Sequence, residues 1–137
     1  MTRFIQGLII AVIFAVAVSS IVLLQTKNPI TETSVEEVHS LHPHDSSYIL
    51  IDVRTRREYS EERIVNSILL PLHELETRIH ELDRYHTRTI IVYCRTGRRS
   101  MMAAEILKQY GFTVHNMTGG IIRWKTAGFS TITDTTS

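Results

Sequence analysis

The chain has 137 residues, 43% of them hydrophobic, which leaves room for one folded domain with a single core. Its formal net charge is +1, and basic and acidic residues alternate along the chain without long runs of one sign. The broad basic surface of a nucleic-acid-binding protein is therefore excluded. The single cysteine, Cys94, excludes an internal disulfide and a zinc site built on cysteines.

Residues 1–26 are predicted to form a membrane segment. No charged side chain occurs from Phe4 to Thr26, and at about 1.5 Å of helix per residue this stretch can cross a hydrocarbon layer of about 30 Å. A cleaved signal peptide is the competing interpretation, with Ala15-Val16-Ala17 as its cleavage site. We favour a membrane anchor over residues 4–26, because cleavage would leave the apolar residues 21–24 at the new N-terminus. The positive-inside rule then favours a domain on the outer, periplasmic or extracytoplasmic face, with a soluble exported protein as the alternative.

Residues 27–33 are polar and contain a proline, which predicts a linker before a domain at 34–129. Ser34-x-x-Glu37 and Thr55-x-x-Glu58 have the form of capping boxes that open two helices. Further helices are predicted from the apolar spacing of Leu72, Leu75, Ile79 and Leu82, of Ala103, Ile106, Leu107 and Tyr110, and over 121–127.

The predicted strands alternate with these helices. They are residues 48–53, 68–70, 89–93 and 112–117. This order predicts a small α/β domain with a parallel sheet, whose site belongs at the carboxyl ends of the strands. The tail, residues 130–137, is mostly Thr and Ser and is predicted to be disordered.

Cys94 directly follows the apolar strand 89–93 and precedes an amphipathic helix. A thiol at a helix N-terminus faces backbone N–H groups and the positive end of the helix dipole, which favour an anion. Arg95, Arg98 and Arg99 add positive charge around it, and a thiol in such surroundings has a lowered pKa. The alternative is a buried structural cysteine, but such a residue does not require three neighbouring arginines. We therefore predict a reactive thiolate at Cys94.

Asp52 and Arg54 lie where the strand 48–53 ends, at the edge of the sheet where the site is expected. They are predicted to form an ion pair or cap that fixes the loop, or to support the site. His42 and His44 stand in a loop with a proline and without a third ligand, so we predict no metal site.

Three motifs together resemble the rhodanese family of single-domain sulfurtransferases. They are Ile51-Asp-Val-Arg-x-x-x-Glu58-Tyr59, Cys94-Arg-Thr-Gly-Arg-Arg-Ser100 and Thr118-Gly-Gly-Ile-x-x-Trp124-x-x-x-Gly128. The resemblance implies a five-stranded parallel sheet flanked by helices. It also implies that Cys94 carries a persulfide between a donor such as thiosulfate and an acceptor, either cyanide or a thiol such as that of a thioredoxin-like partner, without a cofactor.

The resemblance assigns the residues after Cys94 to the small anionic sulfur donor. Backbone N–H groups of Arg95, Thr96, Gly97, Arg98, Arg99 and Ser100 would surround the sulfur. The Arg99 guanidinium would bind the donor anion, with Arg95 and Arg98 at the rim of the loop, and Asp52 and Arg54 would support the loop. The chain departs from the family at Glu62-Arg63 and Asn66-Ser67, where Gly-His and Gly-Ala are common.

Two rival functions remain. Cysteine-dependent phosphatases and arsenate reductases have a Cys-x5-Arg loop, whereas here the sixth residue after Cys94 is Ser100 and Arg99 comes one place early. The loop is therefore one residue short for a tetrahedral phosphate. A rhodanese-like module that only binds a partner or carries sulfur is the other rival, and the retained cysteine argues against it.

Overall fold

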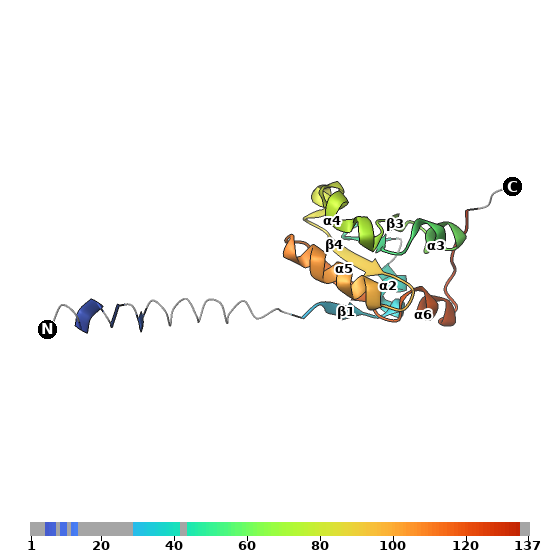
Figure 1. The fold of residues 1–137 in the computed structure, drawn as a ribbon. Helices are drawn as coiled ribbons and strands as arrows, with labels where there is room; N and C mark the ends of the chain where they lie inside the picture. The colour runs from blue at the N-terminus through green and yellow to red at the C-terminus, as the bar shows by residue number, and fades with distance from the viewer. Residues whose placement is uncertain (1–4, 8, 11, 14–28, 42–43, 135–137) are drawn as a thin grey trace.

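The computed structural model describes residues 5–7, 9–10, 12–13, 29–41 and 44–134 (Figure 1). Five parallel strands form one sheet in the order β1-β5-β4-β2-β3. Their bounds are β1 Thr31–Thr33, β2 Tyr48–Asp52, β3 Ile68–Leu69, β4 Thr89–Tyr93 and β5 Thr113–Met117. The predicted α/β class and five-stranded parallel sheet are confirmed, with β4 at the centre of the sheet.

Each central strand divides its side chains between two apolar layers. Ile49, Ile51, Ile90 and Val92 pack in one layer, and Tyr48, Leu50, Ile91 and Tyr93 pack in the other. The first layer is completed by α5 (Arg98–Gln109) and the segment 72–85, and the second by α2 (Val35–Leu41) and α6 (Gly120–Thr126). In Figure 1, α5 lies across β4 on the side of the viewer. Burial on both faces explains why β2 and β4 are apolar runs without a polar alternation.

Both predicted capping boxes are present. Before α2, the Glu37 N–H donates to Ser34 Oγ at 3.1 Å, and the Ser34 N–H donates to Glu37 Oε2 at 2.8 Å. Before α3 (Arg56–Glu61), Thr55 and Glu58 make the same reciprocal pair. These local bonds fix where two helices begin, and the second one places Glu58 near the cysteine loop.

The single helix predicted from Leu72 to Leu82 is wrong in detail. The segment divides into the 3-10 helix η1 (Leu72–Glu74), the short helix α4 (Leu75–Arg78) and the 3-10 helix η2 (Ile79–Tyr85). Two of the three apolar steps, 72 to 75 and 79 to 82, are three residues long. That spacing matches the period of a 3-10 helix, so these pieces still bury one apolar side.

Two predicted boundaries need correction. The linker expected over 27–33 ends in strand β1, which pairs with β5 at the sheet edge in the register Thr31 to His115. The tail expected to be disordered from residue 130 is ordered through Asp134. Ile132 forms an antiparallel bridge with Arg63, through two backbone hydrogen bonds of 2.8 Å, and Asp134 pairs with the Arg63 guanidinium at 2.6 Å. These contacts hold Ile132 and Asp134 against the residues that follow α3.

Most of the predicted membrane segment, residues 1–26, lies outside the described residues. Within the parts of the chain that the structure does describe, no helix has both the length and the apolar character needed to cross a bilayer.

Candidate active site

Cys94 stands between the end of β4 and the loop that opens α5. Its side chain is 1% exposed and belongs to the apolar layer under α5. Gly97 precedes the first residue of α5 with φ at 102°, a left-handed conformation that favours glycine and turns the loop back toward the thiol. The predicted position of the thiol, between a strand end and a helix start, is confirmed.

Hydrogen-bond donors surround the Cys94 sulfur. The Gly97 N–H donates to Sγ at 3.1 Å, and the Ser100 hydroxyl oxygen lies 3.4 Å from Sγ and 3.1 Å from the Gly97 carbonyl oxygen. Burial alone would raise the pKa of the Cys94 thiol. The Ser100 hydroxyl and the N–H groups of Ser100, Thr96 and Gly97 outweigh burial, so the pKa of Cys94 is lowered from its ordinary value. The groups that lower this pKa most are neutral donors of the loop, and the Arg99 guanidinium also has a favourable electrostatic interaction with the Cys94 thiolate.

Helix α6 holds the carbonyl side of the same loop. The N–H of Ile121 donates to the Cys94 carbonyl oxygen at 2.9 Å, and the N–H of Ile122 donates to the Arg95 carbonyl oxygen at 3.2 Å. A Cβ atom at Gly120, whose φ is 58°, would overlap both carbonyl oxygens. The Gly-Gly turn that the sequence places before α6 is therefore what allows α6 to approach the thiol.

The Arg99 guanidinium is bound to the carboxylate of Glu58. Nη1 and Nη2 donate to the two Glu58 carboxylate oxygens at 2.8 and 2.7 Å. The Arg99 hydrogen bonds, with those from Thr55, lower the pKa of Glu58 to about 2. Glu58 thus joins the start of α3 to the start of α5. That Arg99 binds the donor anion stays a prediction, and in this structure both Nη atoms of Arg99 are already bound to the Glu58 carboxylate.

Arg95 and Arg98 differ from Arg99 in being exposed. Neither makes an ion pair with any residue that the structure describes. Their charges are therefore available at the rim of the loop, as predicted.

Asp52 and Arg54 form a buried ion pair, one of the two roles predicted for them. Arg54 Nε and Nη2 donate to the Asp52 carboxylate at 2.6 to 3.1 Å, and the side chains are 5% and 0% exposed. Arg54 Nη2 also donates to the Glu62 carbonyl oxygen at 2.6 Å. This pair links the end of β2 to the turn after α3, so it is a support of the site and not an open anion ligand.

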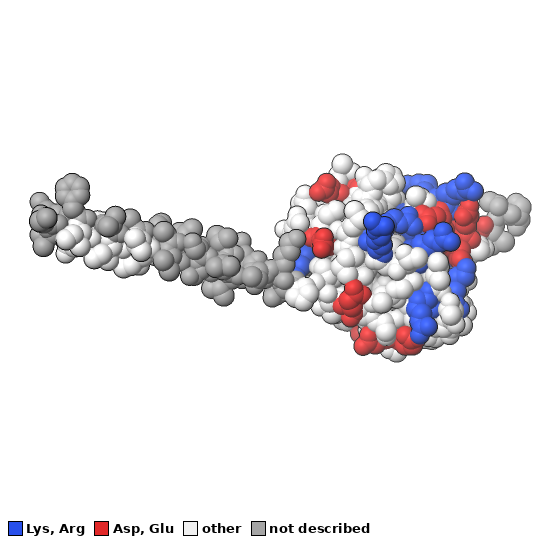
Figure 2. Space-filling model, turned by 60° about the horizontal axis from the view of Figure 1, so that its bottom comes forward, with Lys and Arg blue, Asp and Glu red and all other residues white. Residues whose placement is uncertain are grey.

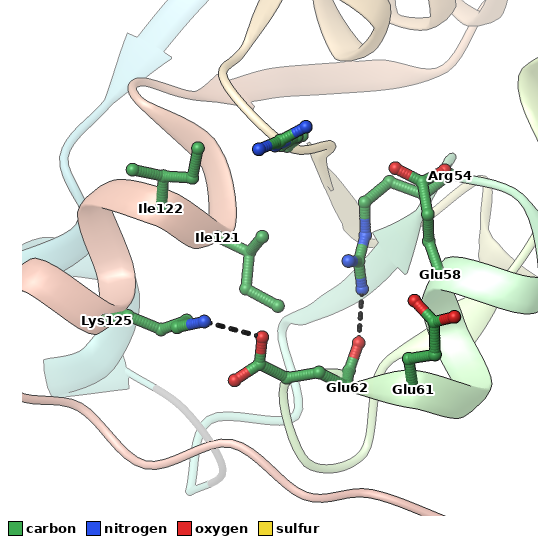
Figure 3. Close-up of a pocket in the computed structure, with 8 residues that line it drawn as sticks. Arg54, Glu58, Glu61, Glu62, Ile121, Ile122 and Lys125 are labelled. Atoms are coloured by element: carbon green, nitrogen blue, oxygen red, sulfur yellow. Dashed lines mark hydrogen bonds and ion pairs between the residues drawn. The ribbon is translucent and has the colours of Figure 1, made fainter.

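A pocket of about 350 Å³ opens beside the thiol loop (Figure 3). Residues from the loop after β2, from α3 and the residue after it, from the thiol loop and from α6 line it: Arg54, Glu58, Glu61, Glu62, Arg95, Ile121, Ile122 and Lys125. Sequence reasoning missed Glu61, Glu62 and Lys125, because only the folded chain brings the end of α3 next to α6. Figure 3 shows Glu58 and Glu61 on one side of the pocket and the α6 residues on the other, with the Glu62 side chain extended between them to Lys125.

Residues 34–127 match the family of rhodanese-like domains. The chain belongs to this family. A sulfurtransferase of Allochromatium vinosum is 37% identical over 81 residues, which cover 58% of this chain and 74% of that protein. The thiosulfate sulfurtransferase PspE of Escherichia coli is 38% identical over 71 residues, covering 52% of this chain and 68% of PspE. The crystal structure of a rhodanese-related protein from Thermoplasma volcanium matches with a TM-score of 0.68 at 27% identity, covering 74% of this chain and 97% of that one.

The rhodanese-like domain accommodates its own departures from the family pattern. Asn66 adopts a left-handed φ of 59°, the conformation that a glycine would otherwise supply. Ser67 Oγ donates to the Ile64 carbonyl oxygen at 2.7 Å and lies 3.0 Å from the Tyr93 hydroxyl. Glu62 accepts hydrogen bonds from Lys125 and Thr131, each at 2.8 Å. Ser67 thus contacts Tyr93 of β4, and Glu62 contacts Lys125 of α6 and Thr131. The cysteine loop itself stays complete.

Proposed function

We propose that the chain is a sulfurtransferase that moves a sulfane sulfur from thiosulfate or a similar donor, through a persulfide on Cys94, to cyanide or a thiol. The observation that carries this proposal is the set of donors around Sγ, from Gly97, Thr96 and Ser100, which lowers the pKa of the thiol. The family membership and the name of PspE support thiosulfate as the donor.

The first half-reaction forms the persulfide. The Cys94 thiolate attacks the outer sulfur of thiosulfate, the bond between the two donor sulfurs breaks, and sulfite leaves with that electron pair. The second half-reaction reverses the roles: cyanide or an acceptor thiolate attacks the terminal sulfur and Cys94 leaves as a thiolate. The N–H groups of the loop stabilise the anionic sulfur in both stages. Arg95 and Arg98 attract the anionic donor to the loop.

The geometry of the loop favours transfer of sulfur over hydrolysis of a phosphate ester. A Cys-x5-Arg enzyme needs its arginine free to bind the phosphate oxygens, whereas Arg99 comes one residue early and is bound to Glu58. We therefore expect no hydrolysis of p-nitrophenyl phosphate.

The test uses the 137-residue chain with thiosulfate and cyanide. We expect thiocyanate, and mass spectrometry after thiosulfate alone should find one added sulfur on Cys94. Cys94→Ser should lose both, while Ser40→Ala, on the exposed side of α2, should keep both. A chain that neither gains sulfur nor forms thiocyanate would be a binding module instead, and a chain that gains sulfur without forming thiocyanate would be a sulfur carrier.

We also propose that residues 4–26 retain the domain at the outer face of a membrane, on the strength of the uncharged apolar run alone. A thiol reagent that does not cross membranes should then label Cys94 in intact cells. Recovery of the protein from the soluble fraction with an N-terminus near Val18 would overturn the anchor and favour an exported product.

A further inference from the structure

The pocket beside the thiol loop is lined by Arg95, the residue after Cys94, and by α6. Ile121 and Ile122, which line the pocket, are the residues whose N–H groups bind the carbonyl oxygens of Cys94 and Arg95. A molecule in this pocket therefore lies against Arg95, the residue that follows Cys94 in the chain. The anionic sulfur donor needs only an anion-binding subsite. This pocket, however, carries three carboxylates and three cations.

Most of those charges are already compensated. Glu58 and Arg54 belong to the two ion pairs described above, and Lys125 Nζ donates to Glu62 Oε2 at 2.8 Å. Figure 3 shows Lys125 and Arg54 both directed at Glu62, one at its carboxylate and the other at its carbonyl oxygen. These four side chains form the frame of the pocket and are not free to bind a ligand.

Two charged groups of opposite sign remain available. Arg95 makes no ion pair within the described part of the chain. Among the residues that the structure describes, Glu61 pairs only with Arg57, one turn earlier on α3, and these side chains are 60% and 87% exposed. An ion pair so open to water contributes at most about 1 kcal/mol, so a ligand can displace it. Ile121 and Ile122 add an apolar surface beside the two charges.

The wider surface has the same mixed character. On the face shown in Figure 2, basic and acidic side chains lie close together on the right half of the domain, without a field of one sign. Such a surface suits a small ligand that carries both charges better than a strongly acidic or basic partner.

We propose that this pocket binds the sulfur acceptor, and that the acceptor is a small thiol with both an ammonium and a carboxylate group, of the cysteine type. Glu61 binds the ammonium and Arg95 binds the carboxylate. This inference rests on the proposed function and names the acceptor class for it. It makes Glu61, which no motif singled out, a specificity-determining residue.

The transfer step balances without a further reactant. The acceptor thiolate attacks the terminal sulfur of the Cys94 persulfide and forms a new S–S bond. The S–S bond to Cys94 breaks, and Cys94 leaves as a thiolate with that electron pair. One S–S bond forms and one S–S bond breaks, so the transfer needs no oxidant or reductant.

Four acceptors built on one skeleton test the charges separately. Cysteine carries both charges, N-acetylcysteine only the carboxylate, cysteine methyl ester only the ammonium, and N-acetylcysteine methyl ester neither. The 137-residue chain is first loaded with inorganic polysulfide, and transfer is then followed as loss of the added sulfur at equal concentrations of acceptor thiolate. We expect cysteine to react about fivefold faster than either singly blocked form.

Variants assign each charge to its residue. Glu61→Gln should remove the advantage of cysteine over N-acetylcysteine, and Arg95→Gln should remove its advantage over the methyl ester. Glu76→Gln and Arg84→Gln remove the same charges outside the pocket and should keep both preferences.

The outcomes separate this inference from the proposed function. Equal rates for the four acceptors, or preferences that survive both pocket variants, overturn the acceptor pocket while sulfur transfer to cyanide still stands. A Cys94 that never gains sulfur from polysulfide or thiosulfate overturns the proposed function and this inference together.

Discussion

Arg99 and Glu58, 41 residues apart in the sequence, form a two-pronged ion pair with N–O distances of 2.8 and 2.7 Å. Glu58 also caps α3 through Thr55, so one carboxylate serves a local helix start and a distant loop. The pair fixes the first turn of α5, on which the thiol loop depends.

Glu58→Gln should lower the free energy of unfolding at pH 7 by about 1 kcal/mol, because glutamine keeps the capping box and loses only the negative charge that faces Arg99. The pKa of Glu58 is lowered from 4.5 to about 2, so its contribution is complete above pH 4.5 and is lost as the pH falls toward 2. Urea unfolding across this range should show the wild type and the variant converging. Glu76→Gln serves as the charge-matched control, and a constant difference down to pH 2 would exclude the pair as the cause.

Ser100→Ala should raise the pKa of the Cys94 thiol, because it removes a hydroxyl that lies 3.4 Å from Sγ. The pH profile of Cys94 alkylation by iodoacetamide should therefore move to higher pH. Ser40→Ala should leave the profile in place. An unchanged profile for Ser100→Ala would assign the lowered pKa to the backbone N–H groups alone.

Gly120→Ala should destabilise the domain by about 3 kcal/mol, because the new Cβ would overlap the carbonyl oxygens of Cys94 and Arg95. Gly128→Ala is the matched control. Its φ is also positive, at 84°, but a Cβ there meets nothing within 4 Å, so only the backbone cost of about 1 kcal/mol remains. Equal losses at the two positions, measured by urea unfolding, would mean that conformation and not contact makes Gly120 necessary.

Arg54→Met should cost about 3–5 kcal/mol, because it leaves the Asp52 carboxylate buried without a counter-charge. Asp52→Asn combined with Arg54→Met should recover much of that loss, since no unpaired charge is then buried. Thermal unfolding of both variants and of the wild type gives the comparison. A double variant no more stable than Arg54→Met would show that the Arg54 hydrogen bond to Glu62 is the larger contribution.

The sequence was informative wherever the deciding interaction is local. The apolar strands, the two capping boxes and the position of Cys94 depend on neighbours along the chain, and the structure confirms them. Strand β1 was missed because the segment Thr31–Thr33 has no apolar alternation, and only its pairing with β5 makes it a strand.

The rest of the candidate site depends on contacts that spacing does not encode. The motif around Cys94 shows three arginines as equivalent cations, but the fold binds Arg99 to Glu58 and leaves Arg95 and Arg98 exposed. The approach of α6 to the thiol loop, and hence the pocket, follows from packing on the sheet. A Gly-Gly pair signals a turn but does not say which carbonyl oxygens that turn will meet.

Because α6 binds the carbonyl oxygens of Cys94 and Arg95, those two peptide groups cannot rotate without breaking hydrogen bonds at 2.9 and 3.2 Å. The Thr96 N–H, one of the groups that lower the pKa of Cys94, belongs to the second of these peptide groups, so its direction is set before any reactant arrives. In the proposed cycle the resting thiolate and the persulfide anion carry the same unit of negative charge, so one arrangement of dipoles serves both. In that cycle the reorganisation energy of the loop between the two half-reactions would be small, and the transfer would need no conformational change of the loop.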